Sequence, residues 1–212
     1  MADHWVVVGV GPGDYRLITP EALNEIREAE ILMGSRRILE NFALPEQSCY
    51  EISGDLEGLR LNLIAWKARR IALLVSGDPG FYSILNWLKK EFPGVKLRVI
   101  PGISSMQLAF ARLAQSWYDC RFISLHGRVS TDLALEAVAN PKVCFLTDER
   151  NSPAGIVKAL QKAGLRDKWL FIGSSLGTTA EQIWQGRLAD YEETALNEPY
   201  SVVIVEDESL AL

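Results

Sequence analysis

The chain has 212 residues, which is enough for one large domain or two of ordinary size. Hydrophobic residues make up 48% of it and charged residues 23%, the composition of a soluble globular protein. A net charge of −5 argues against a nucleic-acid partner, although a few local arginines would suffice to bind a small anion.

Cysteines and apolar segments narrow the class of protein further. Cys49, Cys120 and Cys144 are odd in number and widely spaced, so neither a disulfide framework nor a zinc site is expected. The N-terminus lacks the basic segment of a secretory signal, and no apolar stretch reaches the roughly 18 residues of a membrane span. We therefore expect a cytoplasmic protein with no protein-bound metal and no membrane association.

The first half of the chain alternates strand and helix patterns. Trp5–Val10 is β-branched and almost uninterrupted, which is typical of a strand buried on both faces of a parallel sheet. A helix is expected after Thr19, which would cap it, with Pro20 at its first position. Further strands are expected at Ile31–Met33, Ile71–Val75 and Val95–Ile100, and further helices at Leu56–Trp66, Phe81–Leu88 and Met106–Leu113.

The pattern changes around residues 114–119, where we place a boundary between domains 1–115 and 116–212. Strands in the second half are expected at Cys120–Leu125, Val143–Leu146, Trp169–Ile172, Gln182–Gln185 and Tyr200–Glu206, and helices at Thr131–Ala139 and Pro153–Ala163. The sequence thus predicts a two-domain α/β protein, with a mostly parallel N-terminal sheet and a mixed sheet in the C-terminal domain.

Three strands of the first half end in turns rich in glycine and proline, at Gly11–Asp14, Ser76–Gly80 and Pro101–Ser105. Glycine lets the backbone approach a ligand closely, and open α/β sheets bind ligands at the carboxyl ends of their strands. A single turn of this kind could equally be a structural turn that binds nothing. Asp78 could equally serve to cap its turn rather than to contact a ligand. Three such turns at one sheet edge indicate a shared pocket.

The first turn does not match a dinucleotide-binding fingerprint. In that motif the helix begins within the glycines, so that its N-terminus meets the pyrophosphate. Here the helix begins only after Thr19, and no third glycine stands where the motif requires it. A nicotinamide oxidoreductase is therefore a remote alternative.

Few side chains offer evident chemistry. The sequence has no G-x-S-x-G elbow, H-E-x-x-H helix or Walker loop, and it selects no catalytic residue. Arg36 and Arg37 suit the carboxylates of a ligand, or simply begin a solvated helix. His126 follows a strand, where it would contact a ligand or make a structural hydrogen bond. Ligand-binding loops without a nucleophile or metal site fit group transfer from an activated donor.

Five segments that occur in one order carry a family resemblance: Gly9–Asp14, Ser76–Tyr82, Val99–Ser105, Ser124–Arg128 and Phe145–Asp148. Together they resemble the tetrapyrrole methylases, which use S-adenosylmethionine (SAM), over nearly the whole chain. The last two segments and Gly34–Arg37 resemble most the CbiE type. That type is the C5-methylating part of precorrin-6Y C5,15-methyltransferase in cobalamin biosynthesis.

The resemblance implies a homodimer of two-domain α/β subunits with SAM between the domains. The residues that it implies for cofactor binding are Pro12, Gly77, Asp78, Phe81, Ser104, Ser105, Leu146 and Thr147. Those expected to contact the substrate, whose peripheral carboxylates suit arginine, are Arg36, Arg37, His126 and Arg128. The segment Gly173–Thr179 lacks the usual asparagine of the family, so it is assigned no cofactor contact.

The implied reaction is methyl transfer from SAM to C5 of a precorrin or cobalt-precorrin, with any cobalt arriving in the substrate. Because the chain ends at Leu212, C15 methylation and decarboxylation are expected from a separate partner protein. One alternative is the same fold acting on another acceptor, a ribosomal RNA ribose or a diphthamide precursor. Another is a non-catalytic SAM-binding sensor. The net charge of −5 speaks against the RNA acceptor.

Overall fold

A computed structural model gives the structure of residues 5–125 and 132–210, and only these are described. The chain forms two compact units, Met1–Ser104 and Ser105–Leu212, and each is built around a five-stranded sheet. In the described part of the chain, no helix combines the length and apolarity needed to cross a bilayer.

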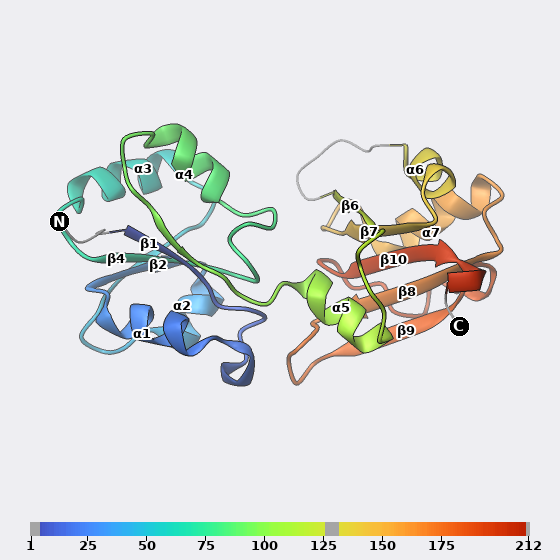
Figure 1. The fold of residues 1–212 in the computed structure, drawn as a ribbon, viewed down its shortest axis with the longest axis horizontal. Helices are drawn as coiled ribbons and strands as arrows, with labels where there is room; N and C mark the ends of the chain where they lie inside the picture. Colours follow the sequence, from blue (N-terminus) through green and yellow to red (C-terminus); the bar gives the residue numbers. More distant parts are fainter. Residues whose placement is uncertain (1–4, 126–131, 211–212) are drawn as a thin grey trace. The chain divides into compact units, whose positions relative to one another are not determined.

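The sheet of the first unit is parallel throughout, with strand order β3-β2-β4-β1-β5 (Figure 1). Its strands are β1 (Trp5–Gly9), β2 (Ile31–Gly34), β3 (Ser48–Glu51), β4 (Ile71–Val75) and β5 (Arg98–Ile100). Helices α1 (Pro20–Glu28) and α2 (Arg36–Phe42) cover one face, and α3 (Leu56–Ala65) and α4 (Leu85–Glu91) cover the other. The short helix η1 (Tyr15–Leu17) follows β1.

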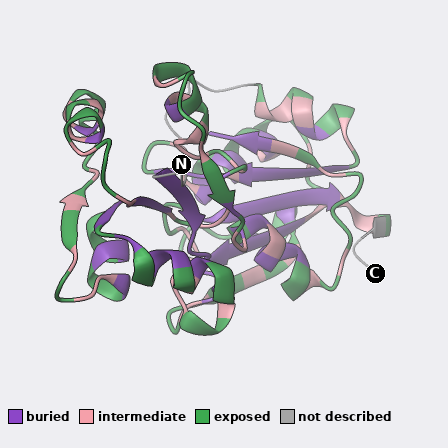
Figure 2. Ribbon diagram, turned by 60° about the vertical axis from the view of Figure 1, so that its left-hand side comes forward, coloured by how far each residue is buried: buried purple, intermediate pink, exposed green. Residues whose placement is uncertain are grey.

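Strand β1 is apolar along its whole length because helices cover both faces of the sheet. Val6 and Val8 belong to the core beneath α1 and α2, whereas Trp5 and Val7 belong to the core beneath α3 and α4. Figure 2 shows the strands as largely buried and the outer surfaces of the helices as exposed.

The predicted cap of helix α1 is confirmed, since Thr19 Oγ1 accepts a hydrogen bond from Ala22 N at 3.1 Å.

The sheet of the second unit is mixed, with strand order β6-β7-β10-β8-β9 (Figure 1). Its strands are β6 (Arg121–Ser124), β7 (Lys142–Leu146), β8 (Lys168–Ser174), β9 (Gln182–Arg187) and β10 (Val202–Asp207). Strand β6 is parallel to β7, whereas β10 is antiparallel to both β7 and β8. The carboxyl ends of β6, β7 and β8 and the start of β10 therefore share one edge. The predicted α/β fold, with its parallel first sheet and mixed second sheet, is confirmed.

Helices cover both faces of this second sheet. Helices α6 (Leu133–Ala139) and α7 (Pro153–Lys162) pack on the face that carries its larger apolar core, and α5 (Ser105–Leu113) packs on the opposite face through Phe110. The short helices η2 (Leu188–Asp190) and η3 (Glu208–Leu210) follow β9 and β10. The structure groups α5 with the second unit, whereas the boundary predicted after residue 115 groups it with the first.

Several elements differ from the predictions made from sequence patterns, among them β5, which begins at Arg98 rather than Val95, and β10, which begins at Val202 rather than Tyr200. Helix α4 begins at Leu85 rather than Phe81, because Tyr82 has a left-handed backbone with φ of 51° that a right-handed helix does not accommodate. The sequence pattern does not predict β3, because its residues are mostly exposed at the sheet edge and lack apolar alternation.

A buried ion pair explains why α5 belongs with the second sheet. Lys142 and Glu206 are 5% and 1% exposed, and Lys142 Nζ lies 3.4 Å from Glu206 Oε2. Gln115, just beyond α5, donates to Glu206 Oε1 at 3.0 Å and accepts from Lys142 Nζ at 2.9 Å. The ring of Phe110 lies 5.8 Å from the same Nζ. These contacts bind the end of α5 to β7 and β10.

Removing one charge of this buried pair is expected to destabilise the protein far more than removing an exposed charge. Lys142→Met leaves the Glu206 carboxylate buried without its counter-ion, which costs about 3–5 kcal/mol. Lys158→Met, the matched control, breaks an exposed ion pair with Glu193 and is expected to cost at most about 1 kcal/mol. Urea unfolding measures both variants, and equal losses would contradict this description of the pair.

Candidate functional site

The three glycine-rich turns of the first unit come together at the carboxyl edge of its sheet. Strands β4, β1 and β5 are neighbours, so the segments that follow them are adjacent. Gly11 N donates to Gly77 O at 3.2 Å, and Gly77 N donates to Gly11 O at 2.8 Å. This pair of backbone hydrogen bonds joins the segment after β1 to the segment after β4.

Glycine is required where these segments cross. A Cβ atom on Gly102 would lie 2.7 Å from Gly9 C and closer still to Gly77 O, and one on Gly9 would lie 2.6 Å from Gly102 N. Gly77 has a φ of 72°, in the left-handed region that glycine adopts without strain. The segment after β5 therefore packs backbone to backbone against the other two. We call Gly9, Gly77 and Gly102 the glycine crossing.

The carboxylate of Asp78 links two of these segments. Its Oδ1 accepts from Gly80 N at 2.7 Å, and its Oδ2 accepts from Gly102 N at 3.1 Å. The first bond caps its own turn, and the second reaches the segment after β5. Phe81 is half-buried, and its ring centroid lies 4.9 Å from that of Tyr82. Asp78 thus has a structural role, and a ligand that contacts it would meet a carboxylate that already accepts two hydrogen bonds.

The serine candidates differ in exposure. Ser104 is buried, whereas Ser105 is exposed and is the first residue of α5. Ser105 is therefore more accessible to a ligand than Ser104.

The two adjacent arginines of α2 point to different partners. Arg37 Nη1 donates to Pro12 O at 3.3 Å, so this side chain reaches the first glycine-rich turn. Arg36 Nε pairs with Glu40 Oε1 at 2.9 Å, and the Arg36 side chain is 77% exposed. Arg37 thus lies against a cofactor candidate, while Arg36 fits the solvated helix start that the sequence also allows.

The candidates of the second unit lie at the carboxyl end of β7. Leu146 O accepts from Leu125 N at 3.0 Å. Thr147 is buried, and its Oγ1 accepts from Ser201 N at 2.7 Å and donates to Ser201 O at 3.0 Å. Thr147 N also donates to Ser201 O at 3.0 Å, so both the hydroxyl and the amide of Thr147 join β7 with β10. His126 and Arg128 lie outside the described residues.

Tyr200 lies at the same edge of the second sheet, and no sequence pattern singles it out. Its φ is 58°, it is 59% exposed, and its hydroxyl donates to Glu149 Oε1 at 3.3 Å. A left-handed conformation costs a residue other than glycine about 1–2 kcal/mol, and such strain gathers at functional sites. In the sequence, Pro199 marks a turn here but not its strained conformation.

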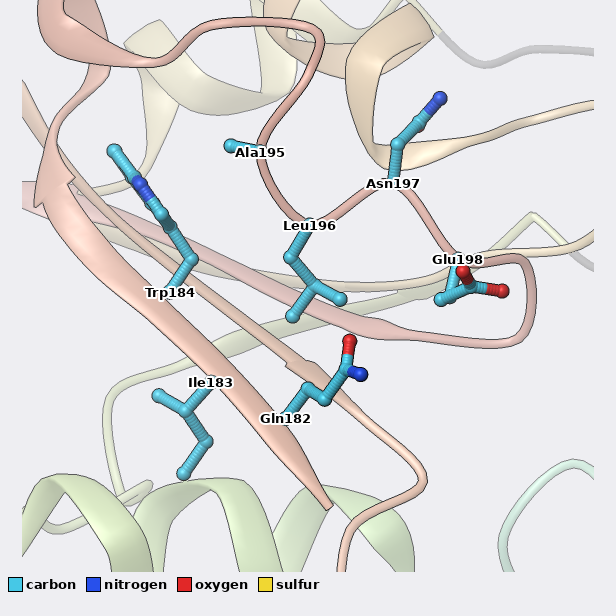
Figure 3. Close-up of a pocket in the computed structure, with 7 residues that line it drawn as sticks. All are labelled: Gln182, Ile183, Trp184, Ala195, Leu196, Asn197 and Glu198. Atoms are coloured by element: carbon cyan, nitrogen blue, oxygen red, sulfur yellow. The ribbon is translucent and has the colours of Figure 1, made fainter. Parts of the chain in front are cut away.

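A hollow of about 420 Å³ lies on the second unit beside β9 (Figure 3). It is lined by Gln182, Ile183, Trp184, Ala195, Leu196, Asn197 and Glu198. The side chains of Gln182 and Leu196 extend toward each other across it. None of the described cofactor candidates lines this hollow, so it does not bear on their assignment.

Across residues 5–125 and 132–210, no group of three or more His, Cys, Asp or Glu side chains is arranged to hold a metal ion.

Comparison with known proteins decides the family. The family model of the Tetrapyrrole (Corrin/Porphyrin) Methylases matches residues 5–192. The chain belongs to the tetrapyrrole methylases. The resemblance inferred from five sequence segments is thereby confirmed, and the matched range includes the glycine crossing and Leu146–Thr147.

A sequence relative and two solved structures of methyltransferases are similar to this chain. It is 34% identical over 195 residues to the cobalt-precorrin-7 C(5)-methyltransferase of Salmonella typhimurium, covering 90% of this chain and 96% of that protein. The methyltransferase CobJ has a TM-score of 0.80 at 22% identity, covering 96% of this chain and 94% of that chain. The uroporphyrin-III C-methyltransferase of Thermus thermophilus complexed with S-adenosylhomocysteine has a TM-score of 0.76 at 24% identity, covering 95% and 96%. At these identities the two structures show the shared fold.

Gly102→Ala is expected to disrupt the glycine crossing, because the new methyl group would overlap backbone atoms of Gly9 and Gly77. Overpacking of this kind costs about 1–3 kcal/mol and would lower the urea midpoint of unfolding. Gly94→Ala is the matched control, since nothing lies within 4 Å of the added methyl group. A Gly102→Ala variant as stable as the wild type would show that the segments do not cross this closely.

The pKa of Asp14, at the end of the first turn, is expected to depend on Arg16. Hydrogen bonds from the side chain and then the backbone of Arg16 lower the pKa of Asp14 from 3.8 to about 2. Because the folded-state pKa is depressed, the stability that this pair contributes is present above pH 3.8 and is lost as the pH falls toward 2. Arg16→Gln should raise the pKa toward 3.8 in a carboxyl-carbon NMR titration. An unchanged pKa would assign the shift to another cause.

Proposed function

We propose that this chain transfers a methyl group from SAM to C5 of a precorrin or cobalt-precorrin in cobalamin biosynthesis. The observation that carries the proposal is the 34% identity to the cobalt-precorrin-7 C(5)-methyltransferase of Salmonella typhimurium over 96% of that protein. A match of this length supports the same class of acceptor over an RNA ribose or a diphthamide precursor. The net charge of −5 also offers little electrostatic attraction for RNA.

The groups at the carboxyl edges of the two sheets suit SAM. Gly77 is half-exposed and Gly80 is exposed, so a ligand can reach the backbone of these two residues without an intervening Cβ atom. Backbone amides, carbonyls and serine hydroxyls complement an amino-acid group and ribose hydroxyls. We assign Pro12, Gly77, Asp78, Phe81, Ser104 and Ser105 to the methionine and ribose portions, and Leu146 and Thr147 to the adenosine.

SAM supplies a sulfonium that is already a good leaving group, so the reaction needs no protein nucleophile. The work of the protein is to bind both reactants, orient the methyl group toward the acceptor carbon and exclude water. The Thermus thermophilus structure contains S-adenosylhomocysteine, which is SAM without the transferred methyl group, and this supports the choice of donor. We assign no catalytic base.

Arginine side chains suit the anionic macrocycle. A guanidinium pairs with a carboxylate through two parallel hydrogen bonds. We assign Arg36, Arg37, His126 and Arg128 to its peripheral carboxylates. Among the described residues of this set, Arg37 has the stronger structural support because it lies against Pro12.

We also propose a cytoplasmic homodimer that works with a separate protein for C15 methylation and decarboxylation. The name of the Salmonella typhimurium relative specifies C(5) alone, which supports this division. Light scattering of the purified protein tests the dimer, and a monomer at assay concentration would rule it out.

The test is an assay with radiolabelled SAM and precorrin-6Y or cobalt-precorrin-7 as acceptors. We expect one labelled methyl group per macrocycle at C5 and an equal amount of S-adenosylhomocysteine, while RNA and NAD(P) are unaffected. SAM binding by calorimetry without transfer to either macrocycle would support the sensor instead. A protein that binds neither SAM nor S-adenosylhomocysteine would overturn the proposed function.

A further inference from the structure

The segment Gly173–Thr179, to which the sequence assigns no cofactor contact, runs from the end of β8 into the turn before β9. We call residues Ser175–Glu181 the β8–β9 loop. It leaves the sheet beside the adenosine candidates, because Gly173 is the partner of Val202 in the β8–β10 ladder, next to Ser201. Ser201 in turn makes its hydrogen bonds to Thr147. The loop therefore begins at the edge where we place the adenosine.

Local bonds fold this loop into a tight turn. Ser175 has a φ of 49° and Gly177 a φ of 78°, so the chain reverses through left-handed conformations. Thr178 N and Thr178 Oγ1 donate to Ser175 O at 3.1 Å and 2.8 Å. A residue other than glycine in this conformation is strained, so contacts from outside the loop are needed to hold it.

One carboxylate connects the loop to α5. Glu181 Oε1 accepts from Arg112 Nε at 2.6 Å, and Glu181 Oε2 accepts from Arg112 Nη2 at 2.9 Å and from Gly177 N at 2.6 Å. Hydrogen bonds from Arg112 lower the pKa of Glu181, so the carboxylate is charged at neutral pH. This bidentate geometry is the strong form of an arginine–carboxylate pair. The same carboxylate thus holds both α5 and the strained turn.

Helix α5 is a firm anchor for the loop. Phe110 packs against Phe122 of β6, and Gln115 bonds the buried pair of Lys142 and Glu206. The first residue of α5 is Ser105, a cofactor candidate. One end of the helix thus carries a proposed SAM contact, and its last turn carries the arginine that holds the loop.

We propose that Arg112 and Glu181 are positioning residues that lock the β8–β9 loop to α5 and thereby set the affinity for SAM. The inference rests on the proposed function. A loop already held in its binding conformation loses less entropy when the ligand arrives. Without the pair, only a fraction of molecules holds the competent loop, and the apparent Kd rises by the inverse of that fraction.

The experiment measures S-adenosylhomocysteine binding by calorimetry for the wild type, Arg112→Gln and Glu181→Gln. We expect the Kd to rise about tenfold in both variants, as when the competent loop falls to a tenth of molecules. Arg112→Lys keeps the charge but loses the bidentate geometry, so its Kd should lie between those of the wild type and Arg112→Gln. In turnover assays the KM for SAM should rise while kcat changes little.

A matched control separates positioning from general loss of stability. Arg187→Gln breaks another arginine–glutamate pair of the second unit, Arg187 with Glu208, and should leave the Kd within about twofold of wild type. Hydrogen exchange at the Gly177 amide should accelerate in Arg112→Gln and not in Arg187→Gln.

The outcomes distinguish this inference from the proposed function. Wild-type affinity in Arg112→Gln and Glu181→Gln, or an equal loss in Arg187→Gln, would overturn the positioning role and leave the proposed function standing. A wild-type protein that does not bind S-adenosylhomocysteine would overturn the proposed function and this inference with it. If Arg112→Gln does not fold, Arg112→Lys and Glu181→Gln carry the same comparison.

Discussion

Backbone packing at the glycine crossing is the constraint on which the first unit of the proposed site depends. Gly9 and Gly102 let their segments approach more closely than a Cβ atom would allow, and Gly77 supplies a left-handed turn with a φ of 72°. The parallel order β4-β1-β5 delivers these segments side by side, and the apolar core on both faces of β1 holds the strands in place. Asp78 then bonds two of the segments together. Peptide groups are consequently held at fixed positions along this edge, which is what recognition of a polar cosubstrate requires.

In the second unit, hydrogen bonds and ion pairs of side chains hold the strands, the β8–β9 loop and α5 together. Thr147 joins β7 to β10 through Ser201, and Glu181 joins the β8–β9 loop to α5 through Arg112. The buried pair of Lys142 and Glu206 holds the end of α5 on the sheet. Helix α5 is thus bonded both to the sheet and to the β8–β9 loop, while the Thr147–Ser201 bonds lie at the other end of β7.

The proposed chemistry explains why no side chain stands out as a nucleophile. A sulfonium donor brings its own leaving group, so the protein contributes position rather than covalent reactivity. Such a site depends on backbone geometry, on the packing that maintains it and on arginines that suit an anionic acceptor. Loops on a rigid α/β framework suit a site of this kind.

The family, the α/β class and most strands and helices follow from the sequence alone. Apolar runs, caps such as Thr19 and the glycine–proline turns are local signals that act over a few residues. The start of α4, the exposed strand β3 and the membership of α5 in the second unit depend on the folded chain. So do the bond from Asp78 to Gly102, the reach of Arg37 to Pro12 and the strain at Tyr200. Each of these features depends on contacts between residues that are far apart in the chain. Local sequence patterns do not reveal such contacts.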